Sequence, residues 1–78
     1  MILLLQLINR MIYLEYTKHD VENNLQAVRQ GDITIEELCD VLGFNTPHNA
    51  LIQRCNEVLG SNEKMNSAIQ ISFLRAEG

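Results

Sequence analysis

The chain has 78 residues, of which 46% are hydrophobic and 21% are charged, a balance that is typical of one small domain and leaves no room for two. Six Lys and Arg residues against ten Asp and Glu residues give a net charge of −4, which argues against non-specific binding to nucleic acid or anionic lipid. Two cysteines, Cys39 and Cys55, are too few for a disulfide scaffold, so we expect reduced thiols.

The first 30 residues predict one long helix, because no Gly or Pro occurs between Ile2 and Gln30. A straight helix of that length would be ~43 Å long, whereas a compact domain of this size is roughly 30 Å across. Either the helix overhangs its domain and packs on a second copy, or it breaks within residues 17–20, where Thr17 or Asp20 could cap a new helix. We favour a continuous or bent helix.

Apolar residues in this segment recur at alternating spacings of three and four, which is a seven-residue repeat. The stripe is either ordinary core or the contact surface of a homodimer, in which Lys18 would lower stability and fix the register. We favour a homo-oligomer, most simply a dimer. The residues predicted to mediate self-association are Leu4, Leu7, Met11, Leu14, Lys18 and Val21.

Residues 31–60 predict two short helices. Gly31 is suited to end the long helix, and Thr34 with Glu37 forms the pattern of a capping box before a helix over 35–42, which Gly43 would end. Thr46 followed by Pro47 is a second start signal, with Pro at the first helical position and the helix ending at Gly60.

The last segment, residues 61–78, is ambiguous between helix and strand. Met65, Ile69 and Phe73 repeat every four residues, while residues 69–73 also alternate as a strand would. We favour a helix capped by Ser61, because the chain offers too few strands for a sheet. The expected fold is all-α in a single domain, 1–78, with a long N-terminal helix followed by about three short helices.

The middle segment also has the form of a helix-turn-helix corner, with Gly in the turn between two short helices. Its residues 40–55, with Leu42-Gly43-Phe44, Pro47, Ala50-Leu51 and Arg54-Cys55, resemble the opening helices of the Bro-N domain of phage antirepressors. The resemblance covers about a fifth of the chain and implies a DNA-binding transcription regulator. The residues of the second helix that could enter a DNA groove are His48, Asn49, Gln53 and Arg54.

Charge points to a different partner, because all of the net −4 arises within residues 31–60, where Arg54 alone opposes five carboxylates. A DNA-binding surface needs several Lys or Arg contacts to phosphate. Glu36, Glu37 and Asp40 form the densest acidic group. They are either a solvated helix face or a contact for a basic protein surface, and they are the predicted partner-binding residues. We therefore favour a non-enzymatic regulatory or inhibitory module that binds another protein through a helix face, with the DNA-binding regulator as the alternative.

No catalytic or metal-binding pattern stands out in the sequence. It lacks a Gly-rich phosphate loop, a serine elbow and a His-Glu-x-x-His run, and His19 and His48 each stand alone. Cys39 is expected to be a small core residue rather than a nucleophile. The apolar start has neither a preceding basic residue nor a cleavage site. We expect no enzyme activity, no cofactor and a cytoplasmic protein.

Overall fold

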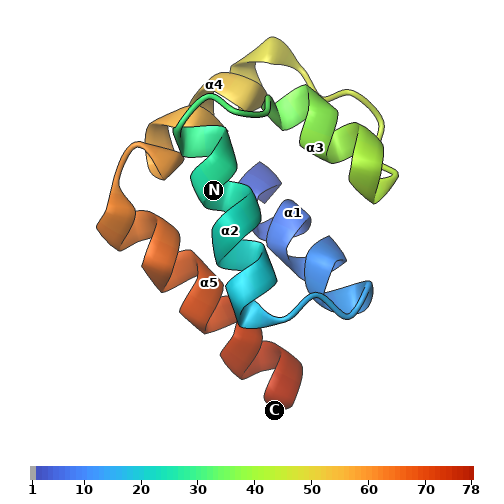
Figure 1. Ribbon diagram of the computed structural model, residues 1–78, viewed down its shortest axis with the longest axis vertical. Coiled ribbons are helices and arrows are strands. Elements are labelled where there is room, and N and C mark those ends of the chain that lie inside the picture. Colours follow the sequence, from blue (N-terminus) through green and yellow to red (C-terminus); the bar gives the residue numbers. More distant parts are fainter. Residues whose placement is uncertain (1) are drawn as a thin grey trace.

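The computed structural model describes residues 2–78, which form five helices and no strand. The helices are α1 (Ile2–Tyr13), α2 (Lys18–Arg29), α3 (Ile35–Leu42), α4 (Asn49–Leu59) and α5 (Asn62–Glu77). The all-α fold class predicted from the sequence is confirmed. In Figure 1, α2 lies in front of α1, with α5 on one side and α3 on the other.

The expected long N-terminal helix is two helices of 12 residues each, separated by residues 14–17. The chain turns back between α1 and α2, and the molecule measures 33 × 26 × 21 Å. A continuous helix would exceed the longest of these dimensions. The continuous or bent helix that we favoured is therefore wrong. The chain breaks, as the other possibility had it, but at residues 14–17 rather than 17–20, with Thr17 as the cap of the second helix.

A hydrogen-bonded turn at residue 15 ends α1. The Tyr16 amide donates to the Met11 carbonyl oxygen at 2.9 Å, and the Glu15 amide donates to the Ile12 carbonyl oxygen at 2.9 Å. These two bonds define a Schellman motif, which requires a left-handed residue at its centre. That residue is Glu15, with φ of 67°. Glycine usually fills this position. Because Glu15 fills it here, no glycine in the sequence marks the end of α1.

Thr17 starts α2 with a complete capping box. The Asp20 amide donates to the Thr17 hydroxyl at 3.1 Å, and the Thr17 amide donates to the Asp20 carboxylate at 3.0 Å. The backbone N–H of Thr17, together with its hydroxyl, lowers the pKa of Asp20 below its ordinary value. The turn and the cap together reverse the chain within four residues.

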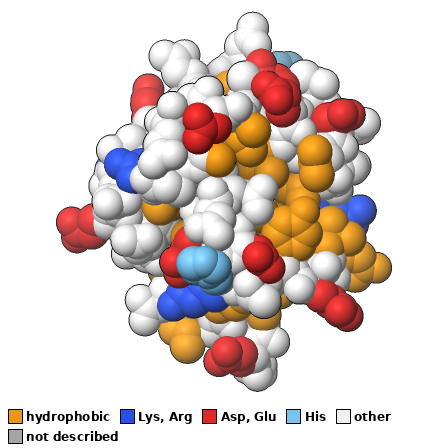
Figure 2. Space-filling view, in the orientation of Figure 1, with side chains coloured by type: hydrophobic (Ala, Val, Ile, Leu, Met, Phe, Trp, Pro, Cys, Tyr) orange, Lys and Arg blue, Asp and Glu red, His pale blue; other side chains and the backbone are white. Residues whose placement is uncertain are grey.

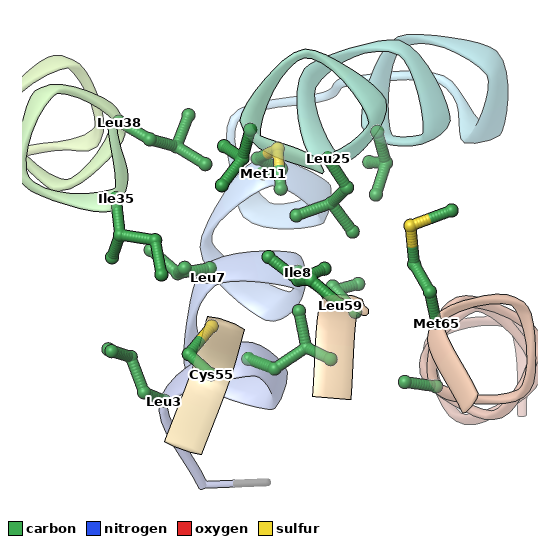
Figure 3. Packing of buried hydrophobic residues seen from close by; sticks show 14 of the residues in the cluster. Leu3, Leu7, Ile8, Met11, Leu25, Ile35, Leu38, Cys55, Leu59 and Met65 are labelled. Atoms are coloured by element: carbon green, nitrogen blue, oxygen red, sulfur yellow. The ribbon is translucent and has the colours of Figure 1, made fainter. Parts of the chain in front are cut away.

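The reversal allows α1 to lie at the centre of the core, where it packs against α3, α4 and α5. Figure 3 shows Leu7 and Ile8 of α1 with Ile35 and Leu38 on one side and Leu59 on the other. Of the six residues predicted for self-association, four are fully buried in this core: Leu4, Leu7, Met11 and Val21. The stripe is therefore mainly the core of a single chain.

The ends of α3 lie at the predicted residues. Thr34 caps its start by accepting the Glu37 amide at 3.1 Å. Gly43 ends it in the left-handed conformation with φ of 82°, and the Phe44 amide donates to the Cys39 carbonyl oxygen at 2.8 Å. One detail differs, because the Glu37 carboxylate accepts the Thr34 hydroxyl at 3.2 Å instead of the backbone amide that a capping box would use.

The start of α4 is two residues later than predicted. His48, not Thr46, is the N-cap, and its side chain makes no capping hydrogen bond. Pro47 lies before the helix. The fixed φ of proline suits an extended residue as well as the first helical turn, so both positions are compatible with it. Gly60 follows the last residue of α4, as predicted.

The C-terminal segment is a helix, as predicted. Ser61 is its N-cap, and the Ser61 hydroxyl accepts the Lys64 amide at 3.3 Å. Met65, Ala68, Ile69 and Ser72 form its buried side. The alternation of residues 69–73 therefore does not mark a strand, and it leaves Ile71 on the outer side of the helix.

The left-handed residue between α1 and α2 generates a stability prediction. Glu15→Gly should raise the free energy of unfolding by about 1 kcal/mol, because an L-residue in this conformation is strained by roughly that amount and glycine is not. Urea unfolding measures the change. Glu15→Ala is the control, since it removes the carboxylate but keeps the Cβ atom, and it should not stabilise. A gain with alanine as large as with glycine would contradict the prediction.

Candidate functional site

The outer side of α3 gathers the three acidic residues predicted to bind a partner. Ile35, Leu38, Cys39 and Leu42 face the core, so Glu36, Glu37 and Asp40 are all exposed on the other side. Glu36 and Asp40 are one helical turn apart. The structure thus brings the predicted partner-binding carboxylates onto one face of a helix of eight residues.

Exposed apolar side chains lie on α3 beside the carboxylates and at the end of α1. Two of them, Val41 and Tyr13, were not predicted from the sequence as surface residues. Val41 of α3 is 71% exposed and Tyr13 of α1 is 75% exposed. Leu14, which follows Tyr13, is 42% exposed. Figure 2 shows hydrophobic atoms gathered in a patch beside acidic ones. We call Glu36, Glu37, Asp40, Val41, Tyr13 and Leu14 together the α3 surface.

Arg10 holds the α1 part of this surface against α3. Its Nε atom donates to the Leu42 carbonyl oxygen at 2.9 Å, and its guanidinium carbon lies 5.3 Å from the centre of the Tyr13 ring. Tyr13 and Leu14 follow Arg10 by one helical turn and so share its side of α1. A cation at the C-terminal end of α3 also complements the helix dipole. The side chain therefore links the C-terminal end of α3 to Tyr13 at the end of α1.

The α3 surface is suited to recognition. Its helix is capped at both ends, by Thr34 and by Gly43, so little backbone order has to be gained on binding. Carboxylates around exposed apolar side chains match a partner that presents Lys or Arg beside apolar residues.

The residues of the helix-turn-helix hypothesis lie at the start of α4. His48, Asn49, Gln53 and Arg54 are all exposed, and Asn49 and Gln53 are one helical turn apart on the same side. The connection between α3 and α4 covers residues 43–48, which is longer than the three or four residues of a helix-turn-helix. Among these four residues Arg54 is the only Lys or Arg.

The residues predicted for self-association are divided between core and surface. Leu4, Leu7, Met11 and Val21 are fully buried inside one chain, so in this fold they do not reach a second copy. The contact surface predicted along the stripe is corrected accordingly. Leu14 and Lys18 are exposed and remain available to a partner.

Both cysteines lie in the core with free thiols, as expected for Cys39. Burial raises the pKa of the Cys39 thiol above its ordinary value, with a contribution from Glu36. Burial also raises the pKa of the Cys55 thiol to about 11. Raised pKa values keep both thiols protonated and poorly nucleophilic at neutral pH. Among residues 2–78, no group of three or more His, Cys, Asp or Glu side chains is placed to hold a metal ion.

A separate groove of about 490 Å³ lies between the C-terminal ends of α2 and α4 and is lined by Gln26, Arg29 and Asn56 among others. The Arg29 guanidinium donates to the side-chain oxygens of Gln26 and Asn62. Arg29 therefore ties the end of α2 to the start of α5, and the two helix C-termini around the groove do not favour an anion there.

No protein-family model, curated protein or solved structure matches the chain at a significant level. Across the part of the chain that the structure describes, none of the helices has the length and apolar character needed to cross a bilayer.

The raised pKa of Cys55 generates a prediction about stability at high pH. The unfolded thiol ionises with a pKa near 9.0 and the folded thiol with a pKa of about 11, so the stabilisation is complete below pH 9 and is lost as pH rises towards 11. The loss should be about 2 to 3 kcal/mol.

Urea unfolding at a series of pH values between 8 and 11 measures the loss. The control is Cys55→Ala, which we expect to be less stable at pH 8 because side-chain contacts are lost, but to decline less with pH. If the two proteins lost the same stability over this range, Cys55 would not be the group responsible.

Proposed function

We propose that the protein is a non-enzymatic regulatory or inhibitory module that binds another protein through the α3 surface. One observation carries the proposal: three exposed carboxylates lie on the same short, doubly capped helix as an exposed valine. A solvated helix face explains the carboxylates alone, but it does not explain why Val41 and Tyr13 remain exposed beside them.

The partner that fits best presents a basic and apolar helix or strand face. Aromatic residues such as Tyr13 commonly supply much of the binding energy of an interface, and Val41 is a second exposed apolar side chain. The surrounding carboxylates attract a basic partner over long range and disfavour acidic ones. Free thiols in the core are consistent with a reducing compartment such as the cytoplasm.

A DNA-binding regulator of phage or bacterial type remains the second candidate function. It is supported by the exposure of His48, Asn49, Gln53 and Arg54 at the start of α4, together with the resemblance of residues 40–55 to the Bro-N domain. The six-residue connection and the acidic α3 weigh against it, because phosphate contacts depend on several Lys or Arg side chains. We therefore rank it below protein binding.

A designed probe tests the protein-binding function. The probe is an amphipathic helical peptide of about 18 Lys and Leu residues, added to ¹⁵N-labelled protein and followed by NMR. We expect chemical-shift changes at residues 36–41 and at Tyr13 and Leu14. The same peptide with Glu in place of Lys should not bind.

Two matched charge reversals localise the interaction. The double change Glu36→Lys with Asp40→Lys should weaken peptide binding by about tenfold or more. The double change Glu57→Lys with Glu63→Lys alters the net charge equally, at exposed positions on α4 and α5, and should have a much smaller effect. Equal weakening by both variants would mean that net charge, rather than the α3 surface, governs binding, and would contradict the proposal.

Titration with a mixed-sequence DNA duplex at low salt distinguishes the second candidate. Fluorescence anisotropy should show no binding in the micromolar range. Micromolar affinity that falls steeply with salt, with shift changes at residues 48–54, would replace our proposal by the DNA-binding function.

A further inference from the structure

The outer side of α5 carries exposed apolar residues in the second half of the helix. Ile71 is 45% exposed and Leu74 is 59% exposed, and the two lie one helical turn apart. Met65, Ala68, Ile69 and Ser72 already bury the opposite side of the same helix against the core. A surface helix of a single chain is usually apolar on one side only, so Ile71 and Leu74 form a small apolar patch outside the buried side of α5.

A groove runs beside these residues, between the start of α2 and the second half of α5. It has a volume of about 420 Å³ and is lined by Lys18, Gln70, Phe73, Leu74 and Glu77. Phe73 packs against the core from this side and stays half-buried. Near the end of α5, Figure 2 shows hydrophobic atoms next to both basic and acidic atoms. The groove therefore offers an apolar contact with a cation and an anion at its edge.

The distribution of charge indicates which kind of partner fits the outer side of α5. Although the chain carries a net charge of −4, α5 is neutral, because Lys64 and Arg75 balance Glu63 and Glu77. Two copies that met through the α3 surface would bring six carboxylates together, and like charges oppose such an interface. Two copies that meet through α5 bring together surfaces without a net charge, so like-charge repulsion does not oppose the contact.

We propose that a second copy of this chain covers the outer side of α5, in a two-fold dimer with the two α5 helices antiparallel. An axis passing between residues 71 and 74 places Leu74 of each copy opposite Ile71 of the other. Lys18, predicted from the sequence to take part in self-association, lies at the edge of this interface, in the groove.

The area available makes the dimer weak. A standard interface covers about 800 Å² per partner, whereas the whole chain exposes 5126 Å², and the patch on α5 is a small part of that surface. We therefore expect dimerisation in the range of about 100 µM to 1 mM rather than at nanomolar concentration.

Sedimentation equilibrium over a concentration series from about 10 µM to 1 mM tests the dimer. The average mass should rise from the 8.9 kDa of one chain towards twice that value. Leu74→Asp should weaken dimerisation by about tenfold or more. Circular dichroism verifies that the variant is folded, which we expect because Leu74 is exposed.

Val41→Asp is the matched control, because it introduces the same charge at an equally exposed apolar residue on the α3 surface. It should dimerise as the unmodified chain does. A monomer at 1 mM would overturn the dimer, and so would a Leu74→Asp protein that dimerises normally. Loss of the dimer in Val41→Asp alone would place the contact on α3 and also overturn it. None of these results depends on peptide binding by the α3 surface, so the two proposals fail separately.

Discussion

Burial of the α1 stripe inside a single chain is the interaction on which the rest of the structure depends. Leu4, Leu7, Ile8 and Met11 are completely enclosed, and three other helices pack against them. That arrangement requires the chain to reverse directly after α1, so that α2 can pack against α4 and α5. The reversal is made by Glu15 in a left-handed conformation and by the capping box of Thr17 and Asp20. A strained backbone at residue 15 is maintained because the surrounding core holds it in place.

Two consequences for recognition follow from this reversal. With the stripe used internally, the two contact surfaces that we propose are the outer sides of α3 and α5. They differ in charge, since α3 has three exposed carboxylates and α5 is neutral. An acidic surface suits a basic protein, whereas a neutral one suits a second copy of an acidic chain. The same fold can therefore support both contacts without competition between them.

Local signals predicted much of this fold. Both ends of α3, the Ser61 cap of α5 and the end of α4 were correct, because Thr, Ser and Gly act on the backbone of their immediate neighbours. The break after α1 was not favoured, because Glu15 occupies a position where glycine is the usual signal. The Schellman bonds depend on the backbone conformation rather than on the side chain, so residue identity alone did not show them.

The candidate site was only partly predictable for the same reason. The carboxylates of α3 were found from their density, but their apolar neighbours were not, because the contact of Arg10 with Leu42 joins residues far apart in the sequence. A signal for Val41 did exist. The core pattern of α3 is complete with Ile35, Leu38, Cys39 and Leu42, which leaves Val41 as an apolar residue outside the buried stripe.

NMR chemical shifts of the backbone across residues 2–29 test the central reversal most directly. We expect helical Cα shifts in residues 2–13 and again in 18–29, interrupted at residues 14–17, with Glu15 showing the shifts and the coupling of a left-handed residue. An uninterrupted run of helical shifts through residues 14–17 would contradict the folded-back arrangement and would restore the long helix.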